Sequence, residues 1–229
     1  MSLRRHIPNA ITCLNLLSGC IGVIFALKGF YYGVACCVAL SALFDFFDGF
    51  SARLLGAYSP MGKELDSLAD LVSFGLAPAL LVMHGLSLSL PANVAWLSYA
   101  ALLIPVFSAL RLAKFNIDTR QSHSFIGLPV PADALWWIGV CHVFASGATV
   151  PLWLVLCVLL SIILFSYLMV SEIPMFSLKF SSYGWRGNAL RYVLLGISVV
   201  LLAWQGLAGL APAIGVYILL SLWQWRRAA

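Results

Sequence analysis

The sequence predicts an all-α membrane protein: a polytopic bundle of about eight transmembrane helices, forming one integral-membrane domain over 1–229. The first observation behind this prediction is composition, since 62% of the residues are hydrophobic, only 9% are charged and the mean hydropathy is +1.00. A soluble domain carries roughly 25% charged residues. A soluble fold of this size cannot bury so much apolar surface, because the fraction of its surface that stays exposed falls only slowly as chain length grows. Lipid must therefore be the solvent for most of the chain.

The second observation is the length of the apolar stretches. A helix needs about 20 apolar residues to cross the hydrocarbon core of a bilayer. The stretches are also longer than barrel strands and do not alternate strictly, which argues against a β-barrel. The expected spans are 9–28, 31–50, 64–84, 92–113, 130–147, 150–170, 188–205 and 208–225.

The distribution of charge predicts which way the bundle faces. With eight spans both termini lie on one side of the membrane, and that side receives every basic residue except Lys28. Because basic residues accumulate in cytoplasmic loops, we expect both termini to be cytoplasmic. The acidic residues belong to the same half. We therefore expect an integral protein of the cell membrane whose active site faces the cytoplasm.

Four aspartates stand out at the ends of two neighbouring spans. Asp45 and Asp48 close the second span at a spacing of i, i+3, and Asp66 and Asp70 open the third at i, i+4. Residues at these spacings share a helix face. The two helices are antiparallel neighbours with a short connection, so the four carboxylates are expected to meet in one small volume.

Such a cluster needs compensating positive charge. Arg53 and Lys63 are close in sequence, but two cations cannot balance four carboxylates at the edge of a low-dielectric slab. A single intramembrane acid often serves only as a helix cap or a proton relay, whereas four together favour hard divalent ions, which prefer oxygen ligands. Two ions can clamp the attacking and leaving oxygens of a phosphoryl displacement. The expected cofactor is therefore a pair of Mg²⁺ or Mn²⁺ ions.

The same segment matches a known signature, D-x2-D-G-x2-A-R-x8-G-x3-D-x3-D, and so resembles the CDP-alcohol phosphotransferase family. The resemblance covers about 6–180, and the helix pair at about 188–225 is additional. The fixed positions are Asp45, Asp48, Gly49, Ala52, Arg53, Gly62, Asp66 and Asp70.

The resemblance implies a reaction and a role for each aspartate. Enzymes of this family move a phosphate-linked group from a CDP-activated donor to an alcohol and release CMP. By match to the motif, Asp45, Asp48 and Asp66 would bind one metal ion, and Asp45, Asp66 and Asp70 the second. Asp70 would also be the general base.

The resemblance further implies a nucleotide site. It includes an N-terminal element, 7–15, in which Asn9 and Thr12 would reach the CDP group and Asn15 is a further candidate. Ordinary helix capping is the alternative role for these three residues and suits Asn9 well. The expected CDP-binding residues are Asn9, Thr12, Asp48, Gly49, Ala52, Arg53 and Gly62.

The acceptor alcohol is suggested by four further stretches, which resemble the integral-membrane phosphatidylserine synthases within the family. The sequence departs from that pattern at Lys114, where we expect arginine, and at Glu172, where a basic residue is common. The stretches are 73–79, 111–116, 125–132 and 169–179.

Three basic residues are candidates for contacting the diphosphate or the serine carboxylate. Arg111 and Lys114 are spaced i, i+3 at the cytoplasmic end of the fourth span, and Lys63 lies beside the motif. Anchoring at the membrane surface is the alternative role for Lys114, and snorkelling is the alternative for Lys63.

The sequence thus predicts an enzyme that transfers a phosphatidyl group from CDP-diacylglycerol to L-serine. Its expected surroundings are the lipid bilayer and, by the resemblance, a second copy in a homodimer, with no nucleic acid. A sister enzyme acting on glycerol-3-phosphate or inositol phosphate is one alternative. An ion-coupled transporter with an acidic cluster is another.

Overall fold

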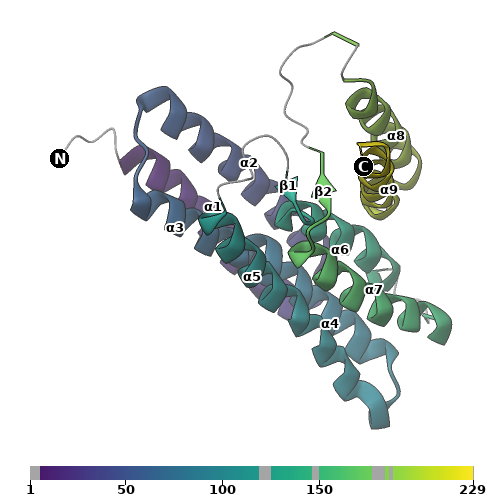
Figure 1. The fold of residues 1–229 in the computed structure, drawn as a ribbon. Coiled ribbons are helices and arrows are strands. Elements are labelled where there is room, and N and C mark those ends of the chain that lie inside the picture. Colours follow the sequence, from purple (N-terminus) through teal and green to yellow (C-terminus); the bar gives the residue numbers. More distant parts are fainter. Residues whose placement is uncertain (1–5, 119–124, 146–149, 177–183, 186–187, 229) are drawn as a thin grey trace.

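The computed structural model describes residues 6–118, 125–145, 150–176, 184–185 and 188–228, which fold into a bundle of long helices (Figure 1). Side chains that face the interior are packed, and large apolar side chains cover much of the outside. Leu17, Ile117 and Leu160, for example, are more than half exposed. An apolar exterior is what a bilayer requires. Several basic residues used to orient the chain lie outside the described residues: Arg4, Arg5, Arg120, Lys179 and Arg186.

The first two helices form an antiparallel pair. α1 (His6–Leu27) and α2 (Tyr31–Leu55) pack along their lengths. The chain reverses between them at Gly29, whose φ of 66° lies in the left-handed region that glycine adopts without a steric penalty. α2 ends at Gly56 in the same conformation, with backbone N–H groups bonded to carbonyls of the last turn.

The third helical run, Pro60–Ser89, is continuous but changes its winding. Ser59 caps its start by accepting a hydrogen bond from the Gly62 N–H at 3.0 Å, and Pro60 occupies the first turn. The run consists of α3 (Pro60–Asp70), a π-helical segment η2 (Leu71–Leu76) and α4 (Ala77–Ser89).

The rest of the main bundle follows with short connections. A 3-10 segment η3 (Ala92–Leu102) continues into α5 (Leu103–Ile117), and α6 (Val130–Ala145) and α7 (Leu152–Val170) complete this part of the bundle. Two two-residue strands, β1 (Phe125–Ile126) and β2 (Pro174–Met175), pair antiparallel beside these helices. Nothing in the sequence pattern predicts that pairing.

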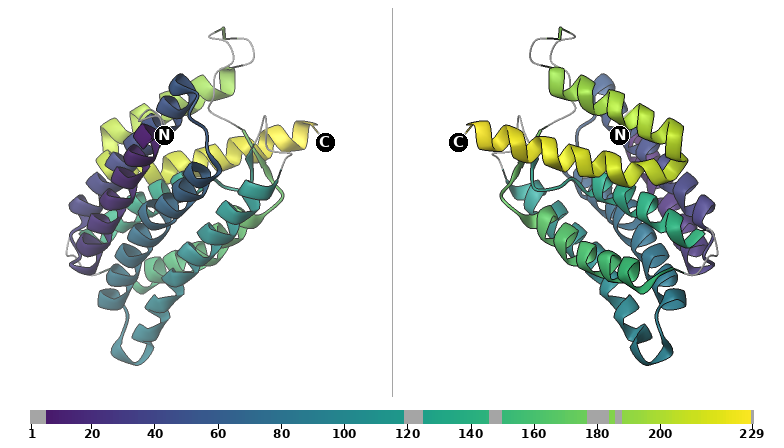
Figure 2. Two further views of the ribbon diagram at one scale, coloured as in Figure 1. Left: turned by 90° about the vertical axis from the view of Figure 1, so that its left-hand side faces the viewer. Right: turned by 90° about the vertical axis from the view of Figure 1, so that its right-hand side faces the viewer.

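The last two helices form a hairpin. α8 (Ala189–Gln205) turns through η4 (Gly206–Gly209) into α9 (Leu210–Ala228). α9 packs against α6 and β2. Figure 2 shows that α9 crosses the direction of the main bundle rather than running parallel to it.

The prediction of an all-α polytopic membrane bundle is confirmed. Among the described residues, six helical runs are long and apolar enough to cross a membrane, and the final run, Ala189–Arg227, contains both helices of the hairpin. The expected span at 130–147 corresponds to α6, a shorter apolar helix of 16 residues. The cytoplasmic location of the termini remains a prediction.

Candidate active site

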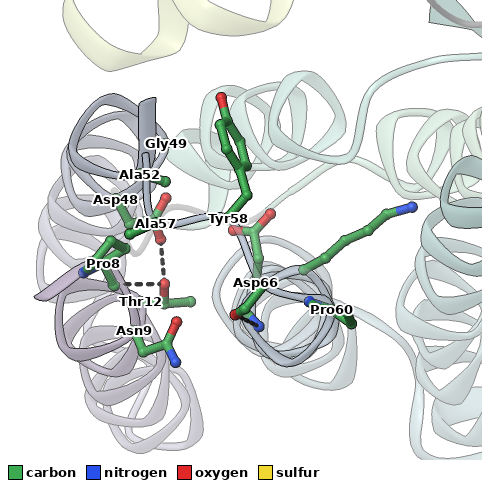
Figure 3. Close-up of a pocket in the computed structure, with 13 residues that line it drawn as sticks. Pro8, Asn9, Thr12, Asp48, Gly49, Ala52, Ala57, Tyr58, Pro60 and Asp66 are labelled. Carbon is green, nitrogen blue, oxygen red and sulfur yellow. Dashed lines mark hydrogen bonds between the residues drawn. The ribbon is translucent and has the colours of Figure 1, made fainter. Parts of the chain in front are cut away.

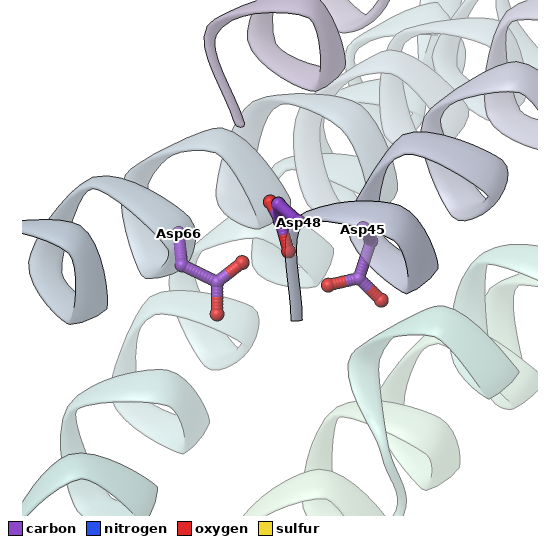
Figure 4. A group of neighbouring side chains, drawn as sticks. All are labelled: Asp45, Asp48 and Asp66. Atoms are coloured by element: carbon purple, nitrogen blue, oxygen red, sulfur yellow. The ribbon is translucent and has the colours of Figure 1, made fainter. Parts of the chain in front are cut away.

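Three of the four motif aspartates meet between α2 and α3. One carboxylate oxygen from each of Asp45, Asp48 and Asp66 lies within 4.8 Å of the others. Figure 4 shows the side chains converging from the two helices. Asp48 is buried and the other two are half-buried. The close approach follows from the antiparallel packing of the end of α2 against the start of α3.

The fourth aspartate lies deeper. Asp70 is the last residue of α3, and its side chain is only 8% exposed. It is close enough to interact electrostatically with Asp45, Asp48 and Asp66, but its carboxylate is not part of the group of three. The side-chain amide of Asn15 donates a hydrogen bond to Asp70 Oδ1 at 3.1 Å.

The cluster fits a divalent metal site. It supplies carboxylate oxygens, the ligands that Mg²⁺ and Mn²⁺ prefer. Asp66 Oδ1 is buried without a hydrogen-bond partner among the described residues. A buried carboxylate oxygen left in that state is costly, and a bound cation would satisfy it.

A cavity of about 500 Å³ adjoins the cluster and includes Asp48 and Asp66 in its wall (Figure 3). The Thr12 hydroxyl lies 2.7 Å from Asp48 Oδ2 and orients that carboxylate. The acidic cluster and the cavity are therefore parts of one site. The cavity is lined by Pro8, Asn9, Thr12, Asp48, Gly49, Ala52, Ala57, Tyr58, Ser59, Pro60, Gly62, Lys63 and Asp66.

Six of the seven residues expected at the CDP group line this cavity, from α1, α2 and α3. The exception is Arg53, which is exposed in the last turn of α2 and is not among the lining residues. Its role in nucleotide binding stays a prediction.

The small residues of the motif explain the shape of the cavity. A Cβ added to Gly49 would meet nothing within 4 Å and would extend into open space. A Cβ added to Gly62 would lie 3.0 Å from both Asn9 Oδ1 and Ser59 Oγ, so that position is tightly enclosed. The absence of a side chain at Gly49 leaves that side of the cavity open. At Gly62 it allows Asn9 and Ser59 to pack closely against the backbone.

The connection between α2 and α3 also forms part of the cavity wall, which the motif residues alone do not predict. Ala57, Tyr58 and Ser59 line the cavity together with Pro60. The eight-residue spacer between Arg53 and Gly62 was the sequence feature that could have indicated these wall residues. A spacer whose length is fixed by the signature holds its own residues at fixed positions beside the motif.

The three basic candidates occupy different environments. Lys63 lines the cavity, and its ammonium donates to the Asn116 carbonyl at 2.6 Å. Lys114 donates to the Val170 carbonyl at 3.3 Å and forms an ion pair with Glu172. The two departures from the expected pattern therefore pair with each other. Arg111 is 6% exposed and interacts electrostatically with Asp70.

Comparison with known proteins gives consistent results. The family model for CDP-alcohol phosphatidyltransferases matches residues 5–132. Three similar proteins, from Bacillus subtilis, Mycobacterium leprae and Helicobacter pylori, are named CDP-diacylglycerol–serine O-phosphatidyltransferase.

The Bacillus subtilis protein is 38% identical over 171 residues, covering 74% of this chain and 89% of the relative. The Mycobacterium leprae protein is 38% identical over 179 residues, covering 74% of this chain but 57% of the relative, so the match spans little more than half of that longer protein. The Helicobacter pylori protein is 32% identical over 229 residues, covering 95% of this chain and 90% of the relative. With the family model matched across the acidic cluster and its cavity, the chain belongs to the CDP-alcohol phosphatidyltransferase family.

Proposed function

We propose that this protein transfers a phosphatidyl group from CDP-diacylglycerol to the hydroxyl of L-serine, giving phosphatidylserine and CMP. The observation that carries the proposal is the sharing of Asp48 and Asp66 between the acidic cluster and the cavity. That arrangement puts a cavity of about 500 Å³ directly against a set of carboxylate oxygens that suit a metal ion. It suits a substrate that contains a diphosphate.

The proposed metal ligands are the four aspartates. Asp45, Asp48 and Asp66 would bind one Mg²⁺ or Mn²⁺ ion, and Asp45, Asp66 and Asp70 a second. When bound, the ions supply positive charge to the diphosphate oxygens and make CMP a better leaving group.

The protein's own residues bind and orient the reactants. Asn9, Thr12 and the open surface at Gly49 would receive the cytidine nucleotide, while the acyl chains of the donor remain in the bilayer. Thr12 keeps the Asp48 carboxylate in place through its hydrogen bond. The cavity thus holds the polar part of a substrate whose apolar part stays in lipid.

Asp70 is the proposed general base. A serine hydroxyl is almost fully protonated at neutral pH, so its proton must be removed as it attacks. The serine oxygen forms a bond to the phosphorus that carries diacylglycerol, the bond from that phosphorus to the CMP oxygen breaks, and the hydroxyl proton moves to Asp70. Its burial beside the other aspartates supports this assignment.

The electrostatics favour a zwitterionic acceptor over an anionic one. A sister enzyme acting on glycerol-3-phosphate or inositol phosphate must bind an additional phosphate and would need several available cations. Here Lys63 bonds to a backbone carbonyl and Lys114 pairs with Glu172. Arg111, close to Asp70, is the proposed contact for the serine carboxylate or the diphosphate, and the names of the relatives support serine.

The proposal includes a setting. The enzyme would lie in the cell membrane as a homodimer with its site open to the cytoplasm, where serine and CMP are soluble. An ion-coupled transporter would instead leave CDP-diacylglycerol intact and move an ion across a vesicle membrane.

The test is CMP release by purified protein in detergent or vesicles. With CDP-diacylglycerol and Mg²⁺ or Mn²⁺, we expect release that depends on serine and is at least about 100-fold slower with glycerol-3-phosphate or inositol phosphate. Faster release with either of these acceptors would contradict the choice of serine. Absence of release with all three would contradict the enzymatic proposal.

A substitution tests the base. We expect Asp70→Asn to bind CDP-diacylglycerol but to lower kcat by at least about 10³-fold, since general-base catalysis alone contributes about 10² to 10⁴ and a metal ligand is weakened as well. The exposed Glu64→Gln, on the same helix, is the matched control and should retain the wild-type rate. Wild-type turnover by Asp70→Asn would remove Asp70 as the base.

A further inference from the structure

Asn15 occupies a point where four helical segments meet. It lies on α1, one turn beyond Thr12, and is fully buried. Its backbone carbonyl accepts hydrogen bonds from Ser73 Oγ of η2 at 3.0 Å and from Ser41 Oγ of α2 at 3.3 Å. Its side chain reaches Asp70 at the end of α3. One residue therefore connects Asp70 to the surrounding helices.

The hydrogen bond from Asn15 is made to a specific oxygen. Nδ2 of Asn15 lies 3.1 Å from Oδ1 of Asp70. A carboxylate has two oxygens and rotates about one bond, so a donor fixed on one of them sets the direction of the other. Asn15 is itself held in place, because it is buried and because Ser41 and Ser73 both donate hydrogen bonds to its backbone carbonyl.

Asn15 retains an unfavourable feature that a purely structural residue would not need. Its Oδ1 is buried without a hydrogen-bond partner among the described residues. Such an acceptor costs on the order of 1–3 kcal/mol. An apolar side chain of similar size would avoid that cost, which points to a use for the amide donor.

The helix after Asp70 reinforces the same contact. Residues 71–76 are wound as a π-helix, a rare form that often occurs at functional sites. Within it, Ser73 donates to the Asn15 carbonyl. A Cβ added to Gly19 would lie 2.8 Å from Ser73 Cα, so α1 and η2 approach as closely as their backbones allow. Asp70 and Asn15 are thereby held on two segments in direct contact.

From this geometry we infer that Asn15 is a positioning residue, which holds the Asp70 carboxylate in the orientation needed to accept the acceptor's proton. The inference rests on the proposed role of Asp70 as the base. It assigns to Asn15 an action through Asp70 rather than a contact with the nucleotide, and Asn15 is not among the residues that line the cavity.

The test is steady-state kinetics of Asn15→Leu, which is similar in size but cannot donate. We expect kcat to fall about 100-fold, the loss associated with a misplaced catalytic group. At saturating Mn²⁺, the KM values for CDP-diacylglycerol and serine should stay within about threefold of wild type. Should Asn15→Leu not be stably folded, Asn15→Ser removes the amide without adding bulk and carries the same expectation.

Ser18→Ala is the matched control. Ser18 lies one turn further along α1, is buried, and donates to the Cys37 carbonyl of α2 at 3.0 Å. The variant therefore loses a comparable hydrogen bond between helices without altering Asn15 or Asp70. We expect its kcat to stay within about twofold of wild type.

Two results would overturn the inference: a kcat for Asn15→Leu within about threefold of wild type, or parallel losses of donor binding and kcat. The second would indicate a merely structural role. Wild-type protein that releases no CMP with any acceptor would instead contradict the proposed function, and wild-type turnover by Asp70→Asn would contradict the base assignment alone.

Discussion

At the scale of single residues, Asp66 connects the two halves of the site. It belongs to the acidic cluster and to the cavity wall, and one of its oxygens is buried without a partner among the described residues. We expect Asp66→Asn to lower Mn²⁺ affinity at least about 100-fold, because losing even an outer-shell partner typically costs 10–100-fold. Titration of purified protein with Mn²⁺, followed by CMP-release assays, measures both effects.

Glu64→Gln is again the control, since it removes the same charge from an exposed position of the same helix. It should bind Mn²⁺ as wild type does. Equal Mn²⁺ affinity in Asp66→Asn and wild type would show that the cluster does not hold the metal.

The residues of the site were predictable to different degrees. Asp45, Asp48 and Asp66 were predicted to meet, because their spacing on helices fixes their faces and the short connection fixes the packing. Tyr58 was not predicted, because a connecting segment has no periodicity from which its direction can be inferred. The contact between Asn15 and Asp70 was not predicted, because it depends on how closely α1 approaches η2.

At the scale of elements, the contact between α1 and η2 sets the site. A methyl group at Gly19 would overlap the backbone of Ser73, so we expect Gly19→Ala to destabilise the protein by about 1–3 kcal/mol through overpacking. It should also lower kcat, because Ser73 and Asn15 would separate. Thermal unfolding in detergent and the CMP-release assay measure the two effects.

Gly196→Ala is the matched substitution, because Gly196 lies inside α8 where an added Cβ meets nothing within 4 Å. Alanine is favoured over glycine in a helix by about 1 kcal/mol. Its Tm should therefore be equal or higher. A Tm for Gly19→Ala as high as that of Gly196→Ala would contradict the close approach.

The helices themselves were predicted within a few residues, because hydrophobicity over about 20 residues determines where a chain can cross lipid. The departures from α-helical winding inside these helices were not predicted. The π-helix at 71–76 and the 3-10 segment at 92–102 have the composition of ordinary apolar helix, and packing against neighbours decides their form. The β1–β2 pair was missed because two-residue strands are too short to show alternation.

At the scale of the whole molecule, the sequence identified a C-terminal pair of helices but not its direction. α8 and α9 are apolar on most of their surface, and such a pattern indicates burial in lipid without indicating an angle. α9 crosses the bundle because it packs on α6 and β2, which are distant in sequence. The buried Tyr217 hydroxyl donates to the Phe176 carbonyl at 3.0 Å and ties α9 to the segment after β2.

The positive-inside rule predicts the orientation of the molecule, and this prediction can be tested directly. Met61, 70% exposed at the start of α3, lies beside the site, whereas Ala92, exposed at the start of η3, lies at the other end of the run Pro60–Ser89. We expect Ala92→Cys to react with a membrane-impermeant thiol reagent in intact cells. Met61→Cys should react only after the membrane is opened, because the distribution of basic residues predicts that this end faces the cytoplasm.

Both substitutions are made in a protein whose six native cysteines are replaced by alanine or serine, and whose CMP release is first shown to persist. The two positions lie at opposite ends of a single helical run, so they must react from opposite sides if the run spans the bilayer. Labelling of Met61→Cys in intact cells, with protection of Ala92→Cys, would show that the molecule has the opposite orientation in the membrane. It would place the acidic cluster outside the cell and contradict the proposed cytoplasmic active site.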